Sequence, residues 1–246
     1  MGVLRQRMFG TKPRSSHARV VEALGSAIVT GEFPELSTLP GDQQLLERFG
    51  VSRSVLREAM KTLAAKGLIR AKSRVGTRVT PRDLWNFVDS DVITWKMQGG
   101  MDPEFVDHLC EMRLAFEPAA AGLAAKNATS DEIVTLYGIA ARIDNPDHSR
   151  ESIAQEDLNF HLAVAEMSRN PFMRSVSTLI EAALAVSFQI SSPALSPEMI
   201  SRCASQHLRI ASAIASRDPE TAAECMRAVI LEGAMRSREA LLRGER

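Results

Sequence analysis

The amino-acid sequence predicts a mainly α-helical protein, in which a small N-terminal domain with one β-hairpin precedes an antiparallel bundle of six to seven helices. Three observations support this prediction. The chain has 246 residues, more than the roughly 100–200 usual for one domain. Three helical patterns and one hairpin pattern fill its first third, and only longer helical patterns follow. The net charge also changes sign where these patterns change.

The charged residues are divided unevenly along the chain. The whole sequence has 30 Lys and Arg against 30 Asp and Glu, so its formal net charge is zero. Residues 1–82 hold 15 of the basic residues and 6 of the acidic ones, a net charge of +9, which leaves −9 for residues 83–246. A basic segment can neutralise DNA phosphates, and an acidic one cannot, so we expect nucleic acid to bind the N-terminal part. The alternative at this point is a solvated charged surface without a ligand.

The composition is that of a globular protein, with 45% hydrophobic and 24% charged residues. We see no apolar stretch that approaches the roughly 20 residues of a membrane span, and no secretory signal pattern at the N-terminus. The expected location is therefore the cytoplasm, with no membrane partner. Cys110, Cys203 and Cys225 are widely spaced and include no CxxC pair, so we expect reduced side chains instead of disulfides or a structural zinc cluster.

The N-terminal domain is predicted over residues 15–82, after a tail of residues 1–14. Each of its three helix patterns starts near a serine or aspartate that can cap a helix, and each ends at a glycine. These patterns cover residues 16–31, 42–50 and 52–67. Two β-branched runs, 68–71 and 77–80, flank a turn that contains Gly76. Helix, turn, helix and hairpin in this order predict a winged helix-turn-helix.

The remainder of the chain is predicted to be entirely helical. Glycine, proline and asparagine pairs interrupt the apolar periodicity and separate the helices. The predicted helices cover residues 83–97, 103–126, 130–143, 151–168, 171–190, 197–216 and 219–242. The first lies in a linker, residues 83–101, and the others form an all-helical effector-binding and dimerisation domain, residues 102–246.

The candidate DNA-reading residues gather at the start of the third helix and in the wing. A recognition helix needs polar and basic side chains near its N-terminus, because those side chains face base edges in the major groove. The side chains that meet this need are Ser52, Arg53, Ser54 and Arg57. In the wing, Gly76 permits close approach to DNA, and basic residues surround it: Arg70, Lys72, Arg74 and Arg78.

These residues carry a family resemblance. The segment LPGDQQLLERFGVSRSVLREAMKTLAAKGLIRAKSRVGTRV, residues 39–79, closely resembles the DNA-binding module of GntR-family repressors. The helical remainder resembles the ligand domain of the fatty-acid-regulator (FadR) branch. The resemblance implies a dimeric, effector-gated regulator of operator DNA in which Arg53 and Arg57 are the main operator contacts. Gln43 stands where the fatty-acid regulator has an arginine that helps to read its operator, so the operator is expected to differ.

Three polar residues of the helical part are candidates for binding a metal or an effector. Asp157 and His161 lie four apart, on one side of a helix, and His207 can converge on them. A pair at this spacing is by itself more often a surface pair. In the resembled domain an Asp, the His four residues later and two further histidines hold a divalent metal, which in turn holds an effector carboxylate. The fourth position falls at Val229, whose side chain cannot bind a metal. Two alternatives remain for Asp157, His161 and His207: they form a three-ligand site for zinc or a similar metal, or they bind a polyhydroxylated ligand directly.

Arg113 lies on an otherwise apolar helix, where a buried guanidinium needs a carboxylate partner. One alternative is a salt bridge with Glu117, four residues later. In the resembled family the matching arginine faces the effector pocket, which implies a small carboxylate effector. The segment PRDLWNFVDSDVITW is similar to the linker of sugar-acid repressors, which favours a sugar acid. Trp85 and Trp95 are expected to be interdomain packing anchors.

A metal-dependent enzyme that acts on a small carboxylate is the alternative function, built on Asp157, His161 and His207. We find no nucleophile-base motif, phosphate loop or nucleotide-binding fingerprint to support it. The sequence therefore predicts a regulator rather than an enzyme.

Overall fold

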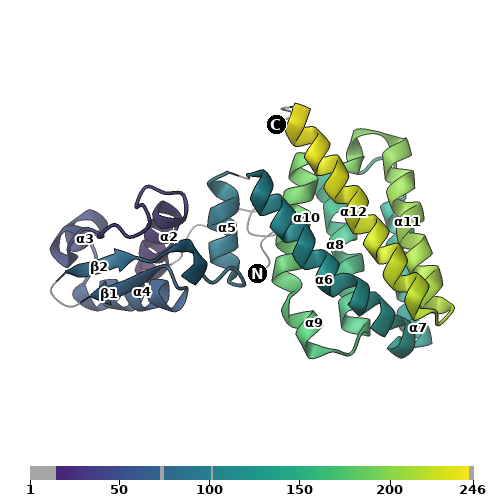
Figure 1. Ribbon diagram of the computed structural model, residues 1–246, viewed down its shortest axis with the longest axis horizontal. Helices are drawn as coiled ribbons and strands as arrows, with labels where there is room; N and C mark the ends of the chain where they lie inside the picture. The colour runs from purple at the N-terminus through teal and green to yellow at the C-terminus, as the bar shows by residue number, and fades with distance from the viewer. Residues whose placement is uncertain (1–14, 73–74, 101, 244–246) are drawn as a thin grey trace. The chain divides into compact units, whose positions relative to one another are not determined.

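The computed structural model describes residues 15–72, 75–100 and 102–243. The chain divides into two compact units, residues 1–101 and 102–246, and each is described by itself. Helices make up most of both units, and a two-stranded antiparallel sheet lies in the first (Figure 1). The predicted mainly helical fold with a small hairpin is confirmed.

The N-terminal unit contains four α-helices and two strands among its described residues. They are α2 (Ser16–Val29), α3 (Asp42–Phe49), α4 (Arg53–Ala65), β1 (Ile69–Lys72), β2 (Gly76–Val79) and α5 (Ser90–Gln98). Their ends follow local signals: the Ser15 side chain caps α2, and Gly50, at φ +62°, ends α3 in the left-handed region that favours glycine. The Ser52 side chain then caps α4.

The wing is a tight hairpin supported by the segment before α3. Strand β1 pairs with β2 so that Ile69 lies opposite Val79 and Lys72 opposite Gly76. Thr38 forms an isolated bridge with Arg78, and the Leu39 amide donates a 2.9 Å hydrogen bond to the carbonyl of Thr77. The preceding loop therefore satisfies backbone groups on the outer edge of β2.

The predicted linker helix over residues 83–97 is wrong at its start. A single 3-10 turn covers Arg82–Leu84, and the α-helix, α5, begins only at Ser90. The physical reason is a strong local cap, because the Asp89 carboxylate accepts hydrogen bonds from the backbone amides of Asp91 and Val92. Lys66, at the end of α4, holds the Asp89 carboxylate at 2.7 Å.

Trp85 and Trp95 do not lie where the sequence led us to expect them. Both belong to the hydrophobic core of the N-terminal unit itself, with 6% and 1% of their surfaces exposed. The Trp85 indole nitrogen donates to the carbonyl of Thr80, so it meets its only hydrogen-bonding need inside the unit. The interpretation of these residues as interdomain anchors is therefore corrected.

The C-terminal unit contains seven α-helices among its described residues. They are α6 (Pro103–Asn127), α7 (Ser130–Ile143), α8 (Arg150–Met167), α9 (Pro171–Ser175), α10 (Ser177–Ile190), α11 (Pro197–Ala215) and α12 (Pro219–Arg243). The predicted helix over residues 171–190 is interrupted at Val176, which separates α9 from α10. The long α12 packs along α6, and α8 packs on α6, α7 and α10 (Figure 1).

One segment meets the length and hydropathy of a membrane span, contrary to our expectation. It is Ser177–Leu195, with a mean hydropathy of 1.3. Most of it is α10, whose buried side chains pack against α6, α8 and α12. Because 56% of its window is buried inside the protein, we interpret the segment as a core helix.

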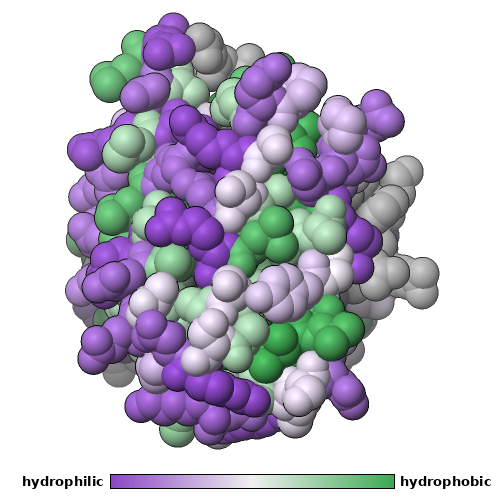
Figure 2. Space-filling view, turned by 90° about the vertical axis from the view of Figure 1, so that its right-hand side faces the viewer, coloured by the Kyte–Doolittle hydropathy of each residue, from purple (hydrophilic) through white to green (hydrophobic). Residues whose placement is uncertain are grey.

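The surface on the side of α7 and α11 combines polar and apolar side chains (Figure 2). Polar residues predominate, and apolar ones gather near the middle and lower right of the view. Among the large apolar residues exposed on these two helices are Val134, Tyr137 and Leu208. Singly exposed apolar residues of this kind are ordinary on a protein surface.

Candidate functional site

The start of helix α4 presents the polar residues that the sequence singled out for DNA reading. Ser52, Arg53, Ser54 and Arg57 are all exposed. The Ser52 hydroxyl accepts from the Val55 amide at 3.4 Å and lies 2.9 Å from the Ser54 hydroxyl. Neither Arg53 nor Arg57 forms a hydrogen bond or ion pair with the part of the chain that the structure describes. Both guanidinium groups are therefore available to bases or phosphates.

The other residues predicted to contact DNA differ in their surroundings. Gln43 is exposed on α3 and donates a 2.8 Å hydrogen bond to Glu47. Gly76 is exposed at the end of the hairpin with φ +101°, where another residue would be strained. Arg74 lies outside the described residues. Arg78 is half-buried, and its Nε donates to the Leu36 carbonyl at 2.9 Å. It therefore stabilises the wing by binding the loop before α3.

The C-terminal unit buries a cluster of ionisable side chains, which we call the polar centre. It draws on three helices and consists of Arg113 and Glu117 from α6, Asp157 and His161 from α8, and Cys203 and His207 from α11. None of the six is more than 6% exposed. Burying so many charged groups is costly unless they are paired or hold a ligand, so this arrangement points to a function or to a tightly paired network.

Arg113 and Glu117 form a buried ion pair. The Arg113 Nε donates to Glu117 Oε1 at 2.5 Å, and its Nη2 lies 3.4 Å from Oε2. Burial alone would raise the pKa of Glu117, but the charges of Arg113 and His161 outweigh it and lower the pKa to about 2. The salt bridge considered as an alternative from the sequence is therefore present.

His161 lies between the Arg113–Glu117 pair and Asp157. Its Nδ1 is against Glu117 Oε2, at ion-pair distance but without the alignment of a hydrogen bond. Its Nε2 lies 3.4 Å from Nη2 of Arg113 and 3.6 Å from Oδ2 of Asp157. The ring is thus in contact with the ion pair as well as with the carboxylate that the sequence paired it with.

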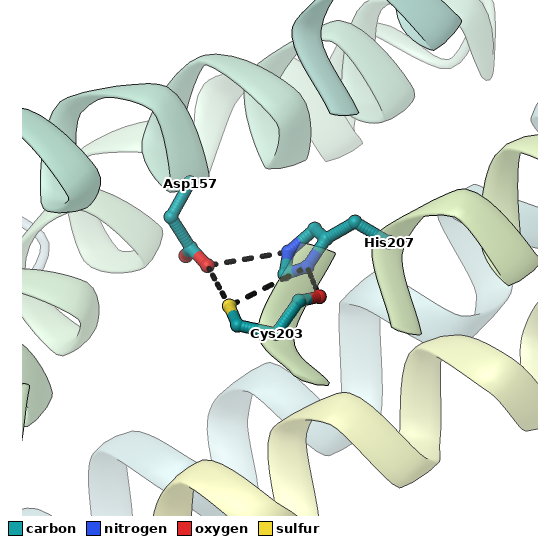
Figure 3. A group of neighbouring side chains, drawn as sticks. All are labelled: Asp157, Cys203 and His207. Carbon is teal, nitrogen blue, oxygen red and sulfur yellow. Dashed lines mark hydrogen bonds and ion pairs between the residues drawn. The ribbon is translucent and has the colours of Figure 1, made fainter. Parts of the chain in front are cut away.

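Asp157, Cys203 and His207 form a compact group (Figure 3). One potential ligand atom from each lies within 4.8 Å of the others. His207 Nε2 is 3.2 Å from Asp157 Oδ1, and the Cys203 sulfur is 3.9 Å from the same oxygen. Burial alone would raise the pKa of Asp157, but the charges of the two histidines and Arg113 outweigh this effect and lower the pKa to about 2. For His207 burial alone would lower the pKa, but Cys203 and Asp157 outweigh this effect and raise the pKa well above its ordinary value.

Sequence reasoning missed Cys203, which we expected to be only a reduced core or surface residue. It is reduced and buried, but its sulfur adjoins two of the predicted ligands. A signal was present, because Cys203 and His207 are four apart and share one side of α11. Val229, where the fourth ligand was sought, is half-buried on α12 and offers no ligand atom.

The donor set of this group fits a divalent metal. Asp157 Oδ2 and His207 Nε2 are buried and have no hydrogen-bond partner among the residues that the structure describes. Buried polar atoms are normally satisfied, so orphaned atoms of this kind need an explanation such as an ion. Carboxylate, imidazole and thiolate are all ligands that zinc accepts.

Two small cavities flank the polar centre. One is lined by Arg113 together with Cys110, Ser187 and Ser237, and has a volume of about 20 Å³. The other is lined by Glu117, His161 and apolar side chains, and has a volume of about 10 Å³. Each is no larger than the space of about one water molecule. A larger cavity of about 410 Å³ lies elsewhere, between the ends of α11 and α12, and Arg202, Arg236 and Arg243 line it.

A basic winged helix-turn-helix, joined in one chain to a helical unit with a buried polar centre, defines a DNA-binding transcription regulator. The chain belongs to the GntR family: residues 17–79 match the model of bacterial regulatory proteins of the gntR family, and residues 108–232 match the FCD domain. In this family the first domain binds operator DNA and the second responds to a small molecule. The alternative of a metal-dependent enzyme is accordingly set aside.

Similar proteins support this assignment. The chain is 30% identical over 224 residues to the galactonate operon transcriptional repressor of Escherichia coli, covering 90% of this chain and 96% of that protein. It is 38% identical over 162 residues, 65% of this chain and 70% of the other, to the E. coli HTH-type transcriptional regulator YieP. The solved structure of Lar, which controls expression of the Listeria monocytogenes agr system, matches with a TM-score of 0.62 at 19% identity, over 93% and 99% of the two chains, and so has the same fold.

Proposed function

We propose that this protein represses an operon for the catabolism of a sugar acid or another small carboxylate, and that the carboxylate releases it from its operator. The observation that carries the proposal is the free, exposed pair Arg53 and Arg57 at the start of the recognition helix, on a chain whose other unit buries an arginine among histidine and carboxylate side chains. Similarity to the galactonate operon repressor favours a sugar acid.

The operator contacts are assigned by chemistry. Arg53 and Arg57 can bind guanine with two parallel hydrogen bonds or grip phosphates, and Ser52 and Ser54 can bond phosphate or base. Gln43 and the wing residues Arg74 and Gly76 complete the proposed contacts. Together with the net charge of +9 on residues 1–82, they account for both the affinity and the register of binding.

The polar centre is the proposed effector site. Arg113 would pair with the effector carboxylate, and Asp157, His161 and His207 would bind its hydroxyl groups or hold a divalent metal such as zinc. A bound metal would supply a positive charge that attracts the carboxylate. Because the flanking cavities of 10–20 Å³ hold about one water molecule, the effector can enter only if side chains or helices of this unit move. That movement is a means of changing the affinity for DNA.

The repressor is proposed to act in the cytoplasm as a homodimer that the helical unit holds together. A dimer places two recognition helices about one DNA turn apart, roughly 34 Å, on a palindromic operator. Light scattering at micromolar concentration tests this part of the proposal. A monomer under all conditions, including with operator DNA, would contradict it.

The decisive test is a DNA mobility-shift titration. The full-length protein is titrated on the region upstream of its own gene, with and without a panel of sugar acids, and with and without a chelator. We expect a specific shift that one acid relieves. An effect of the chelator on that relief would indicate a metal at the effector site, and the absence of any shift would contradict the proposed function.

A pair of variants then locates the effector. Arg113→Lys retains the positive charge but loses the planar fork that binds a carboxylate at two points. It is expected to bind the operator normally and to need a higher acid concentration for release. Arg202→Lys, in the larger cavity that no residue of the polar centre lines, is the control, and a reversed outcome would move the effector site there.

A further inference from the structure

The metal-ligand group that the folded chain brings together differs from the one that helical spacing suggested. We infer that the Cys203 thiolate, in place of His161, completes a divalent metal site with Asp157 and His207, and that the site therefore prefers zinc to magnesium or manganese. The inference rests on the proposed function only in placing a metal at the polar centre. It refines which side chains hold that metal.

The three residues satisfy the geometric needs of such a site. Asp157, Cys203 and His207 are 3%, 6% and 0% exposed, and their ligand atoms lie within 4.8 Å of one another. Tetrahedral zinc with bonds of 2.0–2.3 Å separates its ligand atoms by about 3.3–3.6 Å. The contacts of 3.2 Å between His207 Nε2 and Asp157 Oδ1 and 3.9 Å between Cys203 Sγ and the same oxygen need to change by only a few tenths of an ångström. The Cys203 sulfur lies 3.8 Å from His207 Nδ1, so the thiol must also turn toward Nε2 to share a metal with that nitrogen.

The orientation of His207 leaves one nitrogen for the metal. Its Nδ1 is 2.8 Å from the backbone carbonyl of Cys203, which can only accept, so Nδ1 carries a proton and donates it. Histidines that bind metals are commonly held in this way by a carbonyl. Nε2 lies 3.2 Å from Asp157 Oδ1 but without the alignment of a hydrogen bond, so in the neutral ring its lone pair is left for a cation that the carboxylate also attracts (Figure 3).

His161 is less available than Cys203. Arg113 Nη2 lies 3.4 Å from its Nε2 and can donate to the lone pair that a metal would need. The guanidinium is always charged, so it also repels a cation beside that nitrogen. The other nitrogen of the ring faces Glu117. His161 therefore connects the metal-ligand group to the Arg113–Glu117 pair.

The identity of the ligands selects the metal. Thiolate is a soft ligand that favours zinc, whereas magnesium and manganese prefer oxygen ligands. Three protein ligands also leave the fourth tetrahedral position open, as in other zinc sites that bind an exogenous group. An oxygen of the effector carboxylate can occupy that position.

Cobalt titration of the metal-free, full-length protein tests the inference. A cysteine thiolate bound to Co²⁺ gives a ligand-to-metal charge-transfer absorption in the near ultraviolet, which oxygen and nitrogen ligands do not give. We expect this absorption in the wild type and in Cys225→Ser, whose thiol is equally buried but lies on α12 outside the group. Cys203→Ser is expected to lose it. Zinc affinity of Cys203→Ser should fall by at least the roughly 10- to 100-fold that loss of an outer-shell partner costs.

The outcomes separate this inference from the proposed function. One outcome overturns the inference: the wild type binds Co²⁺ without the charge-transfer absorption, His161→Gln loses cobalt binding, and Cys203→Ser keeps it. In that case the metal of the proposed function still stands. If the wild type binds no cobalt or zinc, both metal assignments fail, whereas the mobility shift with sugar acids still decides the proposed function. Far-UV circular dichroism checks the fold of each variant, and the wild-type spectrum decides the inference even if Cys203→Ser does not fold.

Discussion

A β-carbon at Gly25 would lie 2.3 Å from the indole ring of Trp95. Helices α2 and α5 can pack this closely only because residue 25 has no side chain. Trp95 is 1% exposed, so its ring has no solvent-filled space into which it can retreat. The contact ties the segment after the wing to the core of the DNA-binding unit.

Gly25→Ala is expected to destabilise the N-terminal unit by about 1–3 kcal/mol, the usual cost of overpacking a core. Urea unfolding followed by tryptophan fluorescence measures this directly, because the two tryptophans of the chain both lie in this unit. Gly41→Ser is the control in the same unit, since a β-carbon at position 41 would meet nothing within 4 Å and serine is a favourable N-cap for α3. A Gly25→Ala transition that coincides with the wild type would contradict the packing argument.

Arg57→Ala is expected to abolish specific operator binding while the fold stays intact, because Arg57 is exposed and contacts no other described residue through a hydrogen bond or ion pair. Arg57→Lys separates base reading from phosphate binding. If Arg57 reads guanine, the lysine variant also loses about 1–3 kcal/mol of discrimination. If it grips phosphate, the lysine variant binds nearly normally and the alanine variant has a salt slope smaller by about one. Mobility shifts at several salt concentrations, with circular dichroism for the fold, decide between these results.

Arg113→Ala is expected to destabilise the helical unit by about 3–5 kcal/mol, because it removes the guanidinium partner of the buried Glu117 carboxylate and leaves only His161 beside it. The double variant Arg113→Met with Glu117→Gln removes both charges and should recover much of that loss. Calorimetric unfolding of the two variants measures the difference. If both variants are equally unstable, the loss of stability comes from packing around Arg113 and not from the buried charge of Glu117.

Lys66 is expected to make the N-terminal unit sensitive to alkaline pH. Burial lowers the pKa of Lys66, but hydrogen bonds to Asp89 and Asp91 outweigh it and raise the pKa above the ordinary value of 10.5. The folded state therefore holds the proton more tightly, so the stabilisation is complete below pH 10.5 and disappears as the pH rises through the folded-state value.

Lys66→Met provides the measurement for this prediction. The free energy of unfolding of the wild type minus that of Lys66→Met should stay constant up to about pH 10 and then decrease. Lys61→Met is the control, since its 61% exposed side chain makes only a surface pair with Glu58. A difference between wild type and Lys66→Met that does not change with pH would contradict the assignment.

Local signals in the sequence were sufficient for most of the fold. Capping residues such as Ser15 and Ser52, and glycines such as Gly50, act within a few residues of themselves, so helix limits are readable without the tertiary structure. The same holds for Arg53 and Arg57, because their exposure follows from one helix and its apolar face. The predicted start of the linker helix was wrong, because the Asp89 cap starts α5 at Ser90 although the helical pattern in the sequence begins at residue 83.

The sequence by itself determined the two-part organisation, the basic recognition helix and the pairing of Asp157 with His161 by helical spacing, because each depends on neighbours along the chain. Only the tertiary structure decided that Trp95 belongs to the core of the DNA-binding unit and that Cys203 stands beside Asp157. Contacts between helices depend on how whole elements pack, and no spacing within one helix encodes which residue of another will face it. The buried polar centre is the clearest case, since it assembles side chains from α6, α8 and α11 that are up to 94 positions apart, from Arg113 to His207.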